Sequence, residues 1–247
     1  MNKFYSEISL QEGKEEILEF GDFKFTLILK NEVLEVVSQK GETLETKIFA
    51  LKESKATICL KPAFYDRPFT IKFLNKIELA KVERITFFVK LPIYHDLVLK
   101  VSNKTIILGS TKSLKLNLTS LGEVTKAVLC YFKQSEIGFD HSEMITDFAE
   151  ALIPLSITNK NEELHELTKV IIYHENLGIF AKDEKLFTNE IKITLLREEE
   201  ISLTYSSRTV VSDSNNLISA KEEKINHSFF SLLPGIGKRG AAKDYGF

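Results

Sequence analysis

Residues 23–30 read Phe-Lys-Phe-Thr-Leu-Ile-Leu-Lys, and this stretch indicates how most of the chain folds. Successive side chains of an extended strand point to opposite sides, so the apolar residues at 23, 25, 27 and 29 share one face. Most of the side chains between them are polar and take the other face. The stretch therefore predicts a strand with one buried and one solvated side.

The same two-residue period recurs between residues 15 and 206. Clear runs fall at 69–73, 114–119 and 191–195, and weaker ones at 33–37, 46–51, 56–60, 85–91, 97–101, 152–157, 170–173 and 201–205. Turn signals such as Gly21-Asp22 separate them at spacings typical of sandwiches and barrels. We predict an all-β fold, an antiparallel β-sandwich that is either one large sandwich or two stacked ones.

Two segments depart from the strand pattern. Residues 141–151 carry apolar side chains at helical spacing and predict a short helix within a long connection. From Ser206 the chain becomes rich in Ser, Asn and Asp, which is typical of a linker. We therefore predict a β domain over residues 1–206, with an internal join near residue 120 left open, and a separate linker and tail over residues 207–247.

The composition limits the classes of function. The 247 residues carry 33 Lys and Arg against 35 Asp and Glu, a net charge of −2, which excludes a broadly basic nucleic-acid coat. With 43% hydrophobic and 28% charged residues, the chain falls in the range of soluble globular proteins. No apolar stretch approaches the roughly 18 residues of a membrane span, and the first residues do not resemble a signal peptide. Only two cysteines are present, Cys59 and Cys130, without CxxC spacing, so we expect free thiols and a cytoplasmic location.

Four histidines have an acidic neighbour in sequence, which invites a metal or acid–base interpretation: His95, His141, His165 and His174. Neighbours on a strand point to opposite faces, however, so such a pair does not enter one site without a bend. No catalytic or phosphate-binding motif is visible. We expect no catalytic residue, metal ion or cofactor; the alternative is a hydrolase or metal enzyme with a His and carboxylate site in the β body, which requires these histidines to converge.

The densest turn of the body is Lys61-Pro62-Ala63-Phe64-Tyr65-Asp66-Arg67-Pro68. Its two prolines fix a rigid loop, on which we expect Tyr65, Asp66 and Arg67 to be exposed. Such a loop is either a structural corner or a recognition surface. A further alternative for the whole body is a β-sandwich that binds a sugar or a membrane-protein partner, although the chain has no Trp to line a sugar site.

Three parts of the body carry a family resemblance. Residues 121–136, residues 166–180 and the loop between Pro62 and Pro68 resemble the family catalogued as domain of unknown function 432, which is found mainly in archaea. The resemblance covers roughly residues 15–205. This family has no established activity, so the resemblance implies an ancestry and no mechanism.

The last forty residues carry the sharpest motif. Ile218, Ile225, Phe229 and Leu232 recur at helical spacing and predict an amphipathic helix that stops at Leu233-Pro234.

Residues 230–241 resemble the first half of a helix-hairpin-helix motif. Its hairpin would be Gly235-Ile236-Gly237, where two glycines permit a tight turn and a close backbone approach to a phosphate. Lys238 and Arg239 would contact the same DNA backbone without reading bases.

This tail has three interpretations: phosphate contact, docking onto a protein partner, or an inert end. From Pro234 onward it carries three basic side chains against one acidic side chain, on a chain that is slightly acidic overall. Our leading hypothesis is a non-enzymatic binding or scaffold protein whose tail contacts nucleic-acid phosphates or docks to a DNA-bound partner. The sequence does not indicate the oligomeric state.

Overall fold

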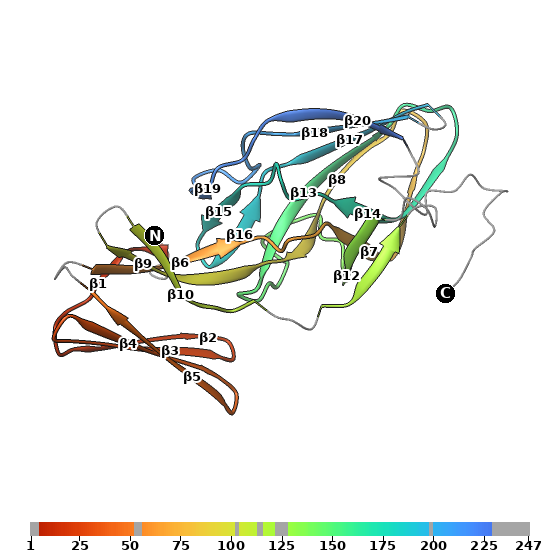
Figure 1. Cartoon of the computed structure of the whole chain (residues 1–247). Coiled ribbons are helices and arrows are strands. Elements are labelled where there is room, and N and C mark those ends of the chain that lie inside the picture. The colour runs from red at the N-terminus through yellow and green to blue at the C-terminus, as the bar shows by residue number, and fades with distance from the viewer. Residues whose placement is uncertain are drawn as a thin grey trace. The chain divides into compact units, whose positions relative to one another are not determined.

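The computed structural model describes residues 5–51, 56–101, 104–112, 116–121, 128–197 and 200–228. All regular elements in these residues are strands, which confirms the all-β prediction (Figure 1). The chain divides into two compact units: unit 1 comprises Met1–Ala63 with Ile93–Ser113, and unit 2 comprises Phe64–Pro92 with Leu114–Phe247. The chain therefore passes between the units three times.

The first sheet of unit 1 is a four-stranded antiparallel meander. Its strands, in spatial order, are β2 (Glu15–Phe20), β3 (Phe23–Lys30), β4 (Val33–Lys40) and β5 (Thr43–Ala50). The predicted strand over 23–30 is confirmed as β3, and Phe25, Leu27 and Leu29 are buried on one face as the alternation required. Two-residue turns connect the four strands, which makes the register unambiguous.

The second sheet of unit 1 packs closely against the meander. Its strands, in spatial order, are β1 (Ile8–Ser9), β6 (Ala56–Ala63), β9 (Tyr94–Val101) and β10 (Lys104–Ser110). Gly109 lies at an irregularity of β10, where a Cβ atom would stand 2.6 Å from Phe25 Cε1 and 3.2 Å from Ser38 Oγ. Only glycine therefore fits where the two sheets approach each other at this point.

Unit 2 contains a four-stranded and an eight-stranded sheet. The four-stranded sheet runs β11 (Leu118–Leu121), β12 (Val128–Ser135), β7 (Phe69–Leu79) and β14 (His165–Ile172). Seven strands of the eight-stranded sheet follow one path: β19 (Asn215–Ile218), β15 (Ile179–Lys182), β16 (Lys185–Thr188), β13 (Glu150–Asn159), β17 (Ile191–Arg197), β18 (Glu200–Tyr205) and β20 (Glu223–Ser228). Strands β16 and β17 pair with one side of β13, and the eighth strand, β8 (Arg84–Pro92), pairs with its other side. Phe73 of β7 meets Phe87 of β8 edge to face at 5.5 Å, and both are buried, so the two sheets pack on each other.

Most strand pairs are antiparallel, as predicted, but three are parallel. These are β12 with β7, and β13 with both β16 and β17. Parallel neighbours need a long crossover connection. Between β7 and β12 that connection includes β9 and β10 of unit 1, so the parallel pair results from the excursion of the chain into the other unit.

The predicted short helix over 141–151 is wrong. Residues 141–143 form a turn, in which the Ser142 amide donates to Asp140 Oδ1 at 2.8 Å, and β13 begins at Glu150. The apolar spacing instead reflects a loop anchor, because Met144 is buried against the eight-stranded sheet in a cluster with Phe88, Leu152, Phe187 and Val211.

The predicted amphipathic helix from Ile218 is also wrong where the structure describes the chain. Asn215–Ile218 and Glu223–Ser228 are strands, and β20 pairs with β18 over six residues. The helical spacing rested on few apolar residues, and pairing with an open sheet edge outweighs such a weak local preference. Residues 229–247, including the rest of this predicted helix and the hairpin motif, lie outside the described residues.

No helix in the described parts of the chain is long and apolar enough to cross a membrane.

Candidate functional site

The outer face of the eight-stranded sheet carries a row of polar side chains. Thr86 of β8 lies opposite Ser156 of β13, Ser156 opposite Lys192 of β17, and Lys192 opposite Thr204 of β18. A second row on the same face consists of Arg84, Thr158, Thr194 and Ser202, which lie opposite one another in this order. The residues between them, such as Phe87, Leu155 and Ile193, are buried toward the other sheet, so strand alternation places these hydroxyl and basic groups on the opposite side.

Glu190, directly before β17, is the centre of this surface. Only 8% of the residue is exposed, and Ser156 Oγ donates a hydrogen bond of 2.6 Å to its Oε1. Its backbone is fixed on both sides, because the Ser206 amide donates to its carbonyl at 3.0 Å and its own amide donates to the Arg208 carbonyl at 3.4 Å. The backbone of Glu190 and the hydrogen bond from Ser156 together position the carboxylate.

Two basic side chains form ion pairs with this carboxylate. Arg84 Nη2 lies 3.8 Å from Glu190 Oε1, and Lys192 Nζ lies 3.4 Å from Oε2. The Arg84 and Lys192 side chains remain 59% and 49% exposed. Glu190 thus orients two cations whose side chains are about half exposed, and its backbone amide bonds to the carbonyl of exposed Arg208. We call Arg84, Ser156, Glu190, Lys192 and Arg208 the basic cluster.

The hydrogen bonds of Ser156 indicate a positioning role. Ser156 Oγ donates to Glu190, lies 2.8 Å from Thr86 Oγ1 and accepts a hydrogen bond of 3.4 Å from Arg84 Nη2. A nucleophilic serine needs a base that takes its proton during reaction, usually an imidazole that is itself oriented by a third group. Here the acceptor is a carboxylate already engaged with two cations. The chemistry that this arrangement supports is the binding of an anion by oriented Arg and Lys groups.

The sequence-predicted site residues Gly235, Ile236, Gly237, Lys238 and Arg239 lie outside the described residues. The last described strand before them, β20, is the edge of the same eight-stranded sheet that carries the basic cluster.

His95 in unit 1 has a structural environment. It is fully buried, its Nε2 lies 3.1 Å from the Tyr5 hydroxyl, and its backbone amide donates to Thr111 Oγ1 at 2.8 Å. Burial lowers the pKa of His95 to about 4 and raises the pKa of Tyr5 to about 12. Both groups are therefore neutral at physiological pH.

The three other histidines of the enzyme alternative belong to unit 2 and have separate partners. His141 contacts the rings of Phe88 and Phe187, with centroids 5.5 and 5.3 Å away. His165 Nε2 lies 3.0 Å from Asn161 Nδ2, and the His174 ring lies 6.0 Å from the Phe64 ring. Within the described residues no three His, Cys, Asp or Glu side chains form a group that could hold a metal ion. The structure does not bring these histidines together.

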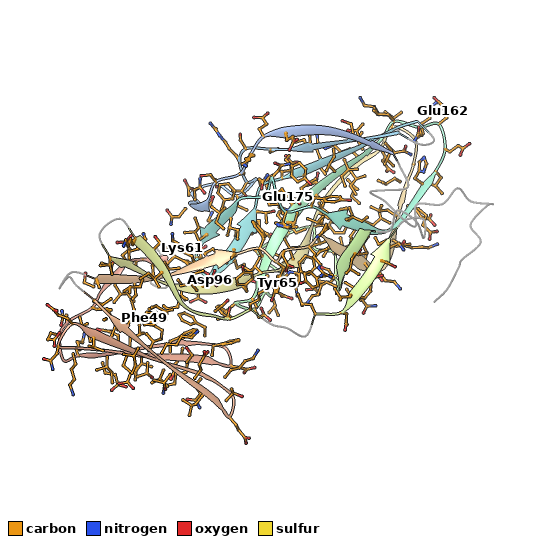
Figure 2. The ribbon with its side chains drawn as sticks, in the orientation of Figure 1. Phe49, Lys61, Tyr65, Asp96, Glu162 and Glu175 are labelled. Atoms are coloured by element: carbon orange, nitrogen blue, oxygen red, sulfur yellow. The ribbon has the colours of Figure 1, made fainter. Side chains whose placement is uncertain are left out.

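The proline loop is a packed corner. Tyr65, labelled in Figure 2, is only 3% exposed and packs edge-on against Phe69 and Tyr131, so its predicted exposure is wrong. The Tyr131 hydroxyl donates to Asp66 Oδ1 at 3.0 Å, and the Arg67 guanidinium lies 6.0 Å from the Tyr131 ring centroid. Asp66 is exposed as predicted. These contacts favour the structural interpretation of the loop.

Sequence reasoning missed the basic cluster. Its members come from three strands and two connecting segments, spread over more than a hundred residues without a fixed spacing. The sequence shows the polar faces of the strands at 84–90 and 191–195. It does not show the strand pairing that aligns these faces.

The chain matches a known protein family. A model of the family described as protein of unknown function, DUF432, matches residues 4–233. No curated protein and no solved structure matches the chain.

Proposed function

Because the chain belongs to the DUF432 family, whose function is unknown, we propose a role from its own surfaces: a non-enzymatic, cytoplasmic binding protein that contacts nucleic-acid phosphates. The contacts would come from the basic cluster and from the tail residues Gly235 to Arg239. The observation that carries this proposal is the pair of exposed cations, Arg84 and Lys192, oriented by the buried carboxylate of Glu190.

The arrangement suits a phosphate backbone because it offers charge without base recognition. Arg and Lys neutralise phosphates and release counterions, and hydroxyl groups add hydrogen bonds to phosphate oxygens. Thr86 and Thr204 lie in the same cross-strand row as Lys192, so hydroxyl groups flank the basic group along it. The basic cluster lies on the face of a sheet and not on a helix that could enter a groove, so we expect weak binding without sequence preference.

The tail would add contacts to the same polymer. It follows β20, at the edge of the sheet that bears the basic cluster, and its own charge is basic. A hairpin with two glycines presents backbone amides to a phosphate, and a short tether between two weak sites raises their combined affinity. In the second form of the proposal the tail docks to a protein that is already bound to DNA. The facing sheets of unit 2 would then form a β-sandwich scaffold.

The test compares binding to a fluorescent double-stranded DNA, by anisotropy, over a series of salt concentrations. The variants are Arg84→Ala with Lys192→Ala, a truncation after Ser228, and both together. We expect each to weaken binding, and the slope of log affinity against log salt to fall by about one for each phosphate-contacting cation removed.

The matched control is Lys72→Ala, because Lys72 is an exposed strand lysine on the other sheet of the same unit. It should leave affinity and slope unchanged. Absence of DNA binding at low salt would overturn the nucleic-acid proposal, and unchanged binding after the truncation would remove the tail from it. A pull-down with and without nuclease then separates a protein partner from nucleic-acid bridging.

A further inference from the structure

Strand β5 is an edge strand of the meander with an unusually apolar exposed side. Its only partner among the described strands is β4, and Figure 1 shows it at the margin of the sheet. Leu44 is 64% exposed and Ile48 is 71% exposed, the highest values among the large apolar residues described in unit 1. Exposed edges of this kind are templates for pairing with another strand.

The register of β4 and β5 determines which backbone groups face the open edge. The Leu51 amide donates to the Glu32 carbonyl at 2.7 Å, and Lys40 lies opposite Thr43 across a two-residue turn. Hydrogen-bonded pairs alternate along an antiparallel ladder, so Thr43, Glu45, Lys47 and Phe49 bond to β4. The amides and carbonyls of Leu44, Thr46 and Ile48 therefore point away from β4, toward the edge.

The sequence of β5 is self-complementary in one register. If two copies pair antiparallel about a twofold axis at Thr46, outward-facing residues lie opposite outward-facing residues, as the ladder requires. Glu45 then lies opposite Lys47 of the second copy, and Leu44 lies opposite Ile48. Moving the axis by one residue places Glu45 opposite Glu45, or Lys47 opposite Lys47. Like charges in direct opposition destabilise a strand pair, so the Thr46 register is the preferred one.

We propose that β5 binds β5 of a second copy of this chain, antiparallel about Thr46, to form a symmetric dimer. The two meanders would join into one continuous sheet through an isologous interface. Leu44 and Ile48 would pack on one face, and the ion pairs would form on the other face, which also carries Phe49 (Figure 2). Glu45 and Lys47 are 3.3 Å apart within one chain, with side chains 60% and 42% exposed, so both are accessible to a partner.

The test is the self-association of the full, nuclease-treated chain, measured by sedimentation over a wide range of concentration. The wild-type chain should dimerise reversibly. Glu45→Lys and Lys47→Glu should each weaken self-association about tenfold or more, because each turns two attractive cross-strand pairs into repulsive ones. Mixed together, these two single variants should associate with each other, and the double charge swap in one chain should restore the dimer.

The control is Glu19→Lys on β2, the opposite edge of the same sheet. Glu19 also forms an exposed ion pair within its chain, 3.1 Å from Lys24, so the change is equivalent in charge and setting. It should leave self-association unchanged, and far-UV circular dichroism should match for all variants. A monomeric wild-type chain at high concentration, an equal effect of Glu19→Lys, or failure of the two single variants to associate would each overturn the proposal.

Discussion

At the scale of single residues, His95 shows how burial rather than sequence neighbourhood determines the chemistry of a side chain. The adjacent Asp96 suggested a pair, yet His95 is fully buried while Asp96 is half-buried on the other face of β9. The alternation argument against paired neighbours is confirmed here. What alternation does not reveal is that Tyr5, ninety residues earlier, supplies the hydroxyl at 3.1 Å.

The lowered pKa of His95 has a consequence for stability. The unfolded chain binds a proton at His95 below about pH 6.5, whereas the folded chain binds it only below about pH 4. Between these values the unfolded state holds more protons, so the stability contributed by His95 is complete above pH 6.5 and is lost as the pH falls toward 4. From pH 7 to pH 5 the loss amounts to about 2 kcal/mol.

We therefore expect His95→Phe to lose less stability than the wild type when the pH falls from 7 to 5, measured by urea unfolding. Tyr5→Phe is the control, because burial, and not the hydroxyl, lowers the His95 pKa. Tyr5→Phe should keep the wild-type pH dependence of stability. Its free energy of unfolding should be about 1 kcal/mol lower, because the hydrogen bond of the Tyr5 hydroxyl is lost. Equal pH slopes for wild type and His95→Phe would contradict this account.

At the scale of elements, the strands at residues 23–30 and 69–73 follow directly from their alternation, since a buried face allows one register only. The C-terminal segment illustrates the opposite case. Apolar residues spaced by three, four or seven positions over a short window fit a helix and an irregular edge strand equally well. The six-residue pairing of β20 with β18 decides between them, and that partner lies outside the window.

This pairing predicts where the chain can be shortened. A truncation after Ser228 keeps β20, and we expect it to unfold at the wild-type temperature. A truncation after Ser214 removes β19 and β20, which leaves the backbone groups of β18 unpaired at a new edge. At about 1 kcal/mol for each lost hydrogen bond, the loss should reach about 3 kcal/mol or more. Thermal unfolding and solubility measure this difference, and equal behaviour of the two truncations would contradict it.

At the scale of the whole molecule, unit 1 is assembled from two separate segments of the chain. Strand β6 ends at Ala63 and its partner β9 begins at Tyr94, and these two residues lie directly opposite each other. Residues 64–93, which carry β7 and β8 of unit 2, thus connect the two strands of one antiparallel pair. In topological terms, they form a long insertion in a β6–β9 hairpin.

We expect a chain of residues 1–63 and 94–113, joined by an Asn-Gly turn, to fold as unit 1 alone. The geometry favours it because a two-residue turn bridges adjacent antiparallel strands. Residues 1–63 alone lack β9, leave the apolar residues of β6 uncovered, and should not fold. Dispersed amide signals in a two-dimensional NMR spectrum of the joined chain, and their absence from the shorter one, would be the expected result. An unfolded joined chain would show that unit 1 depends on unit 2.

The basic cluster also depends on the pairing of strands that are distant in sequence. Arg84 is carried on β8, Ser156 on β13 and Lys192 on β17, and each strand is foreseeable from its own alternation. The pairing that brings these three residues together is not foreseeable from any one strand, because β13 has an antiparallel partner on one side and parallel partners on the other.

The sequence by itself determined the all-β class, the alternating faces of the strong strands and the absence of familiar catalytic motifs, because these depend on neighbours within a few residues. Tertiary structure alone decided the two discontinuous units, the parallel pairs, the burial of His95 and Tyr65, and the joining of Arg84 and Lys192 through Glu190. The physical reason is that strands bond to partners far away in sequence. A strand's own residues specify which face is buried, whereas the choice of partner depends on the packing of the whole chain.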